Sequence, residues 1–262
     1  MALAMVLALT VAACRPAPQG DADDGGAALR AAGYARAPVV STVTQNGPSG
    51  FVVTGQASPD GRVRFIYGPQ RAMGVTADSK GRFRADLPSG PEGGLYDLLI
   101  EDKGHDSSDD SASRLIHAEG RLFIPPGQAA MATLLRSGAP SKRLFNENEA
   151  MAVVDYDGAG ALAVSGRVAV RTRVNIVIDG EIRATALSDA RGDYAATAQI
   201  APPAPDATTL SLTVQTATDT RQRDIAISLP NRRAGDHITA VTDGWRVDWL
   251  LPGGGMQTTL VF

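Results

Sequence analysis

Histidine and cysteine, two residue types that often carry catalysis or hold metals, are few in this 262-residue chain. It has three histidines, and no pair among His105, His117 and His237 is spaced like the ligands of a metal site. Its only cysteine, Cys14, ends an apolar run and is better suited to an anchor than to a nucleophile. A catalytic site needs an acid, a base or a nucleophile held in a cleft. The sequence therefore indicates a protein that is not an enzyme, with no catalytic residues, metal or cofactor.

The most polar stretch of the chain, 102–113, contains four carboxylates. Carboxylate oxygens are the ligands that calcium prefers, but the order of the residues does not match an EF-hand loop. Polar insertions at a sheet edge are common surface features. The stretch is interpreted as a solvated loop, with calcium binding as the less favoured alternative. Its carboxylates are Asp102, Asp106, Asp109 and Asp110.

Arg191-Gly192-Asp193 is an Arg-Gly-Asp tripeptide at a predicted hairpin tip, where a cell-adhesion ligand would present it. The corresponding residues elsewhere in the chain are Lys80-Gly81-Arg82. The glycine is common to both because the turn requires it, and charged neighbours are ordinary at a solvated tip. A turn explains the tripeptide better than adhesion does.

The elements that must position these residues come from an internal duplication. Residues 55–83 align with residues 166–194 without a gap, at a constant offset of 111 residues that pairs Gly55 with Gly166 and Gly81 with Gly192. Each copy begins with a run in which alternate residues are apolar, the period of a strand with one buried face. The positions expected to be buried are Val63, Phe65, Tyr67, Val174, Ile176 and Ile178.

Turn residues separate the strands of each copy. Asp179-Gly180 supplies the positive φ angles of a tight hairpin. Asp78 with Gly81, and Asp189 with Gly192, predict turns in which the Asp accepts backbone hydrogen bonds and the Gly takes the left-handed position.

Seven short strand-like runs in each half predict an all-β protein with two tandem antiparallel β-sandwiches. We expect the first sandwich at 37–126 and the second at 148–230, joined by an interdomain segment at 127–147. In that segment Ala129–Leu135 fits either a short helix or a strand. Arg114–Ile124 is expected to form one strand.

The N-terminus predicts export and a lipid anchor. Residues 1–13 are too short to span a bilayer and end in small residues, as a signal peptide does. Val11-Ala12-Ala13-Cys14 resembles the lipobox of bacterial lipoproteins, although no Lys or Arg precedes the apolar run. That resemblance implies that Cys14 carries diacylglycerol and an N-acyl chain such as palmitate, which would hold the protein stably at a membrane.

Residues 14–36 are expected to contain the acylated cysteine and a flexible tether, because they are rich in Pro, Gly, Ala and Asp and have no sustained period. Among lipoproteins of enteric bacteria an Asp after the cysteine signals retention at the inner membrane. Arg15 stands there instead. The resemblance thus favours an outer-membrane lipoprotein facing the periplasm.

The tail 231–262 has no counterpart in the first half and predicts a C-terminal β-hairpin, with a turn at Pro252–Gly255. Both tryptophans of the chain are in it, and Trp245, Val247 and Trp249 are expected on one face of a strand. An isolated hairpin is marginally stable, so that face must be covered. Packing against the second sandwich, or a bridge between the sandwiches, is the favoured account. The alternative is a contact surface for a glycan or protein partner.

Two repeated motifs carry a further resemblance. Val-x-Gly occurs at Val53 and Val164, and Asp-x-x-Gly-x-aromatic ends at Phe83 and Tyr194. With these motifs each half resembles bacterial immunoglobulin-like domains and the related carboxypeptidase-regulatory-like sandwiches. The resemblance implies an envelope binding, spacer or scaffold protein and transfers no catalytic residues.

The expected function is therefore a lipid-anchored, non-catalytic interaction or scaffold module of the cell envelope. The alternatives are a glycan- or peptidoglycan-binding module and an accessory lipoprotein subunit of an outer-membrane machine. The expected partners are the membrane, through Cys14, and an envelope protein or glycan. A net charge of −3, with Arg residues scattered along the chain, gives no basis for nucleic-acid binding.

Overall fold

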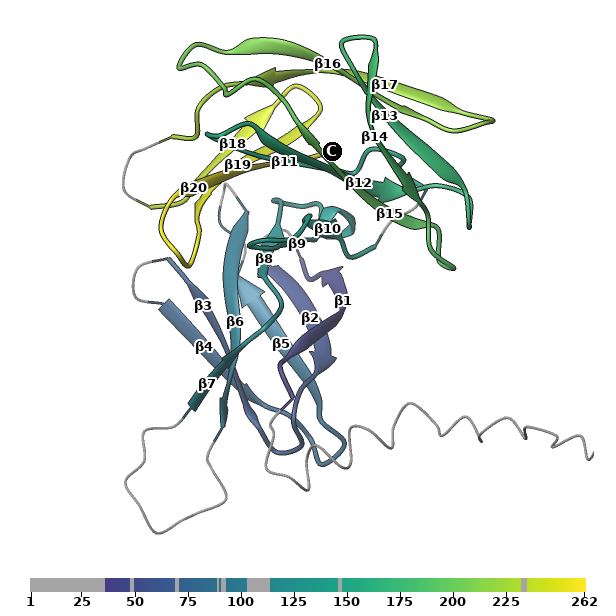
Figure 1. The fold of residues 1–262 in the computed structure, drawn as a ribbon. Coiled ribbons are helices and arrows are strands. Elements are labelled where there is room, and N and C mark those ends of the chain that lie inside the picture. The colour runs from purple at the N-terminus through teal and green to yellow at the C-terminus, as the bar shows by residue number, and fades with distance from the viewer. Residues whose placement is uncertain are drawn as a thin grey trace, which may run out of the picture. The chain divides into compact units, whose positions relative to one another are not determined.

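The computed structural model describes residues 36–47, 50–68, 71–88, 90, 93–102, 114–145, 148–231 and 235–262. The described residues form strands joined by turns and one short 3₁₀ turn, with no α-helix among them. The fold is all-β, as the sequence predicted (Figure 1). The strands of the N-terminal half are β1 (Val39–Gln45), β2 (Gly50–Gln56), β3 (Arg62–Tyr67), β4 (Arg71–Thr76), β5 (Arg82–Pro88), β6 (Gly94–Asp102), β7 (Arg114–His117), β8 (Arg121–Ile124), β9 (Thr133–Leu135) and β10 (Lys142–Arg143).

The C-terminal half adds strands of similar length. Those strands are β11 (Val153–Asp157), β12 (Ala161–Arg167), β13 (Arg173–Ile178), β14 (Glu181–Leu187), β15 (Asp193–Gln199), β16 (Thr208–Gln215), β17 (Thr220–Ile227), β18 (His237–Val241), β19 (Gly244–Leu250) and β20 (Met256–Val261).

Four antiparallel sheets make up the two halves. In the first half, β1-β2-β5 faces a sheet of order β10-β9-β8-β6-β3-β4, in which β7 also pairs with β6. In the second half, β15-β12-β11-β20-β19-β18 faces β14-β13-β16-β17. Each pair of sheets encloses its own apolar core, built around Phe65 in the first half and Ile176 in the second. The predicted sandwich-like arrangement of antiparallel sheets is confirmed.

The duplication is visible in the strand register. Gly55 pairs with Phe83 across β2 and β5, and Gly166 pairs with Tyr194 across β12 and β15. The β3–β4 and β13–β14 pairs also agree, until a bulge in the second copy opposes Val177 to Ile182. A bulge inserts one residue into one strand, so β14 begins one aligned position before β4, while β13 and β3 end at equivalent residues. The gapless alignment therefore holds for the pairing scheme, and the hairpin end is where the copies differ.

The repeated turns have the predicted chemistry. Asp78 Oδ1 accepts from the amides of Lys80 and Arg82, each at 2.9 Å, and Asp189 makes the equivalent pair of bonds. Gly81 has a φ of 78° and Gly192 a φ of 85°, which L side chains rarely adopt. A Cβ at either position would also overlap a backbone carbonyl oxygen. These turns therefore require glycine on two separate grounds.

The described part of the segment 127–147 belongs to the first half, where the sequence indicated a linker between the two sandwiches. It contains a 3₁₀ turn at Ala129–Met131, and β9 and β10 extend the sheet of the first half. The run expected as one strand at Arg114–Ile124 is instead two, because β7 pairs with the end of β6 and β8 with its beginning.

The tail is also more than a separate hairpin. Three of its strands, β18, β19 and β20, form half of the six-stranded sheet, and β20 pairs with β11. Val153 lies opposite Val261 in that pairing, a partner more than a hundred residues away. The tail therefore completes the second sandwich, a long-range pairing that no local pattern specifies.

Candidate functional site

Two of the residue groups chosen from the sequence are outside the described residues. They are Cys14 with residues 15–35 of the tether, and the polar loop after Asp102 with its His105. The lipid anchor and the calcium alternative therefore remain predictions.

The tryptophan face is inside the protein. Val247 is 0% and Trp249 1% exposed, and both pack in a cluster with Leu95 and Phe123 of the first half. Trp249 Nε1 donates to Thr259 Oγ1 at 3.1 Å. This burial favours the packing account, in which the tail bridges the two sandwiches, because a buried side chain offers no surface to a partner.

The third residue of that face, Trp245, is half-buried and lies at the edge of the same cluster. Its Nε1 donates to Gln128 Oε1 of the first half at 3.2 Å. Trp245, Val247 and Trp249 therefore lie at the junction between the halves, and of the three only Trp245 keeps some exposure.

The Arg-Gly-Asp tripeptide lies where β15 begins. Asp193 is the first residue of β15, and its Oδ1 accepts from Arg167 Nε at 2.8 Å. Gly192 is held by the turn described above. The tripeptide is accounted for by the structure of the second sandwich.

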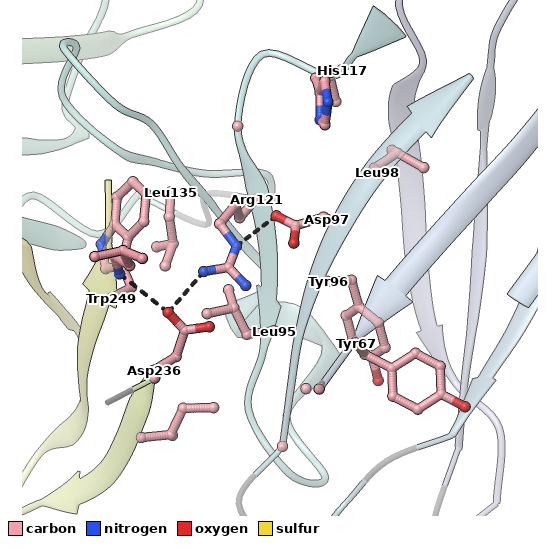
Figure 2. A pocket seen from close by; sticks show the side chains of 18 of the residues that line it. Tyr67, Leu95, Tyr96, Asp97, Leu98, His117, Arg121, Leu135, Asp236 and Trp249 are labelled. Carbon is pink, nitrogen blue, oxygen red and sulfur yellow. Dashed lines mark hydrogen bonds and ion pairs between the residues drawn. The ribbon is translucent and has the colours of Figure 1, made fainter. Parts of the chain in front are cut away.

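A groove with a volume of about 1150 Å³ is lined by residues of both halves (Figure 2). We call it the junction groove. One wall comes from β6 and β8 with the residues before β8, and the other from the start of β18 and the end of β19. Its apolar lining includes Leu95, Leu135 and Trp249, so it lies beside the buried cluster that joins the halves.

Arg121 is the central polar side chain of the junction groove. Its Nε lies 2.7 Å from Asp97 Oδ1, and its Nη1 donates to Asp236 Oδ1 at 2.9 Å (Figure 2). The Nε contact is an ion pair whose alignment falls short of a hydrogen bond. Asp236 also accepts from the amide of Leu250 at 3.2 Å. One guanidinium group thus holds carboxylates from both halves in fixed positions.

A second charged group, centred on Glu119, lies at the edge of the groove. Glu119 lines the groove and accepts from Arg136 Nη1, and its other oxygen lies 3.3 Å from Lys142 Nζ. Burial acts to raise the pKa of Glu119, but the combined effect of these two cations holds it below its ordinary value. Glu119 is therefore an anion committed to its own partners.

A buried carboxylate lies away from the groove, in the second half. Asp155 is 6% exposed, and its oxygens accept from Thr259 Oγ1 and from the amide of Ser141, each at 2.6 Å. Burial raises the pKa of Asp155, and these hydrogen bonds oppose the shift. Because Ser141 belongs to the segment between the sandwiches, Asp155 ties that segment to the second core.

Arg143 is a second unusual polar residue. Its Nε and Nη2 are buried and have no hydrogen-bond partner in the part of the chain that the structure describes. Burial lowers its pKa, and Arg223 adds to this effect while Glu149 opposes it. Arg223 itself stacks over the ring of Phe262, 4.6 Å from its centre.

The described residues hold no group of three or more His, Cys, Asp or Glu side chains placed to bind a metal ion. Within the same residues, no helix is long and apolar enough to cross a membrane.

Sequence reasoning missed Asp97, Arg121, Asp155 and Asp236. Asp155 carried a signal, since it interrupts the apolar run of β11, and a charge in such a run must be paired or neutralised. Arg121 and Asp236 are 115 residues apart, so their pairing could not be seen before the halves were placed together.

Comparison with known proteins identifies no family for this chain. No family model matches it, and no curated protein matches its sequence. Among solved structures, it is similar to a chain described as "Biofilm associated protein - BSP domain", with 15% identity and a TM-score of 0.23. The similarity covers 75% of this chain and 30% of that one.

Proposed function

We propose that this chain is a lipid-anchored protein of the bacterial cell envelope that acts as a non-catalytic interaction or scaffold module. The lipobox resemblance at Val11–Cys14 supports the anchor, and Arg15 supports an outer-membrane location facing the periplasm. The junction groove is the observation that carries the interaction role. Both halves build its walls, and Arg121 of the first half is paired with Asp97 and with Asp236 of the second half.

The anchor is tested by labelling cells with a radioactive fatty acid. We expect label in the wild-type protein and none in Cys14→Ala, because the thiol is the acceptor of the lipid. Equal label in both would reject the anchor.

The interaction role is tested by photo-cross-linking in cells. A photoreactive amino acid at Leu250, which is 54% exposed and lines the groove, is expected to give adducts with an envelope component. Val39 is 56% exposed on β1, outside the groove lining, and is the matched control. Adducts of the same size from both positions would argue against the groove as the contact region.

A glycan- or peptidoglycan-binding module is the second candidate, favoured by the mixed carboxylate and guanidinium lining of the groove. It predicts retention on purified sacculi. An accessory subunit of an outer-membrane machine would instead co-purify stably with that machine.

A further inference from the structure

We propose that the junction groove binds a neutral oligosaccharide, with Asp97, Arg121 and Asp236 as its hydrogen-bonding side chains. This inference rests on the proposed function, in that it treats the groove as a binding site rather than an active site. It adds the class of ligand and the residues that contact it.

The chemistry of these three side chains suits a sugar. A sugar hydroxyl both donates and accepts hydrogen bonds, so it is best met by donors and acceptors side by side. A carboxylate has about four acceptor positions, and the ion pairs of Asp97 and Asp236 use Oδ1 in each case. Arg121 supplies N–H donors between them. The ion pairs also fix these side chains before a ligand arrives, which lowers the entropy lost on binding.

The charges of the groove lining are balanced. Three carboxylates and two guanidinium groups line the groove, and one of those carboxylates, Glu119, is already paired with Arg136 and Lys142. The remaining lining has two groups of each sign. A lining without an excess of one sign favours a neutral ligand over a basic peptide or a polyanion. The carboxylates are Asp97, Glu119 and Asp236, and the guanidinium groups are Arg71 and Arg121.

The groove also has the size and the apolar surface that sugar rings need. Its volume of about 1150 Å³ is slightly above the range of roughly 300–1,000 Å³ for small-molecule sites, so it has room for several sugar rings. Tyr67 lines it and is half-buried, with its ring 5.6 Å from that of Tyr96. Leu250 and Pro252 line the other wall. Aromatic and aliphatic side chains of this kind pack against the C–H faces of sugar rings.

The test is isothermal titration calorimetry with chitohexaose, cellohexaose and maltohexaose. The full-length chain is purified in a zwitterionic detergent that has no sugar headgroup. At least one of the three probes is expected to bind with a dissociation constant below about 1 mM. Asp97→Asn and Asp236→Asn keep the side-chain shape, and each is expected to weaken binding by about tenfold or more.

Asp86→Asn is the matched control, because Asp86 is 63% exposed on β5 and lies outside the groove lining. It is expected to bind as wild type does, and thermal melts check that all three variants are folded. No binding of any probe, an unchanged affinity in both groove variants, or a loss shared with Asp86→Asn would each overturn the proposal. A Lys-rich peptide that binds in place of the sugars would also overturn it. Acylation of Cys14 and cross-linking at Leu250 are independent of these results, so the proposed function can stand if the oligosaccharide site fails.

Discussion

The carboxylate of Asp155 accepts a 2.6 Å hydrogen bond from the hydroxyl of Thr259, and that hydroxyl accepts from the indole N–H of Trp249. β11 and β20 pair with Asp155 opposite Thr259. The chain of hydrogen bonds therefore runs from the core of the second half to the tryptophan that packs against the first. Such a hydrogen-bond network stabilises the fold most when every donor and acceptor in it has a partner.

The stability of the protein should depend on the ionisation of Asp155. Its pKa is raised in the folded state by burial, so the folded state binds this proton more tightly than the unfolded chain does. The stabilisation is fully present below the ordinary pKa of about 3.8 and is lost as pH rises through the folded value. Urea unfolding from pH 3.5 upward, roughly the range of this titration, should show the wild type losing its advantage over Asp155→Asn.

The variant is needed because other carboxylates act in the opposite sense. The pKa of Asp78 is lowered by its backbone hydrogen bond from Arg82, and that of Asp189 by the bond from Arg191. Their contributions are lost as pH falls. Only the difference between wild type and Asp155→Asn isolates Asp155, and a difference that stays constant or grows with pH would contradict the assignment.

The repeated turns should not tolerate a side chain at glycine. Gly192→Ala is expected to cost more than about 1 kcal/mol, because the new Cβ meets the carbonyl of Val168 as well as requiring a positive φ. Gly180 also has a positive φ, of 86°, but its Cβ would have no heavy atom within 4 Å. Gly180→Ala therefore measures the backbone strain alone, and chemical denaturation of both variants gives the difference. Equal losses of stability in the two variants would mean that the backbone near Val168 moves away from the new Cβ at position 192 without cost.

Much of the fold could be predicted because the determining patterns are local. β3, β13 and β14 follow apolar alternation between strong turn residues, and the Asp and Gly of each turn fix the backbone by their own chemistry. The sheet positions of the segments 127–147 and 231–262 were not predicted. β20 pairs with β11, more than a hundred residues earlier, which no local pattern indicates. β9 and β10 pair with β8 and β9, their neighbours in sequence, but these strands are too short to give a clear alternating pattern.

The candidate site was less accessible to sequence reasoning than the fold. The aromatic face at Trp245 and Trp249 was identified as a surface that must be covered, and the choice between core and partner depended on Leu95 and Phe123. Asp97 and Arg121 look like solvated strand residues in sequence. Their place in the groove depends on Asp236, which comes within reach of Arg121 only in the folded chain.

Trp249 should be among the residues most costly to truncate. Trp249→Ala removes a side chain that is 1% exposed and leaves Thr259 without its indole donor, so we expect a loss of roughly 3–5 kcal/mol. Trp245→Ala should cost less, because Trp245 is only half-buried. Thermal and urea melts measure both. A loss at Trp249 below about 1 kcal/mol would contradict its place in the core.

The two halves should unfold together. Phe123 of the first half packs in the same buried cluster as Val247, Trp249 and Val261 of the second, so neither sandwich can open without exposing apolar surface of the other. Both tryptophans of the chain are at this junction, which makes their fluorescence a specific probe of it. Fluorescence excited near 295 nm and far-ultraviolet circular dichroism, which reports all strands, should therefore give coincident transitions.

Phe123→Ala should lower the midpoints of both transitions together. The expected loss in the free energy of unfolding is roughly 3–5 kcal/mol, the value for a buried aromatic side chain. Leu115→Ala is the control, because Leu115 is 47% exposed on β7 and should change neither midpoint. Two separate transitions in the wild type, with only the fluorescence transition shifted by Phe123→Ala, would show that the sandwiches fold independently and that the junction adds little to their stability.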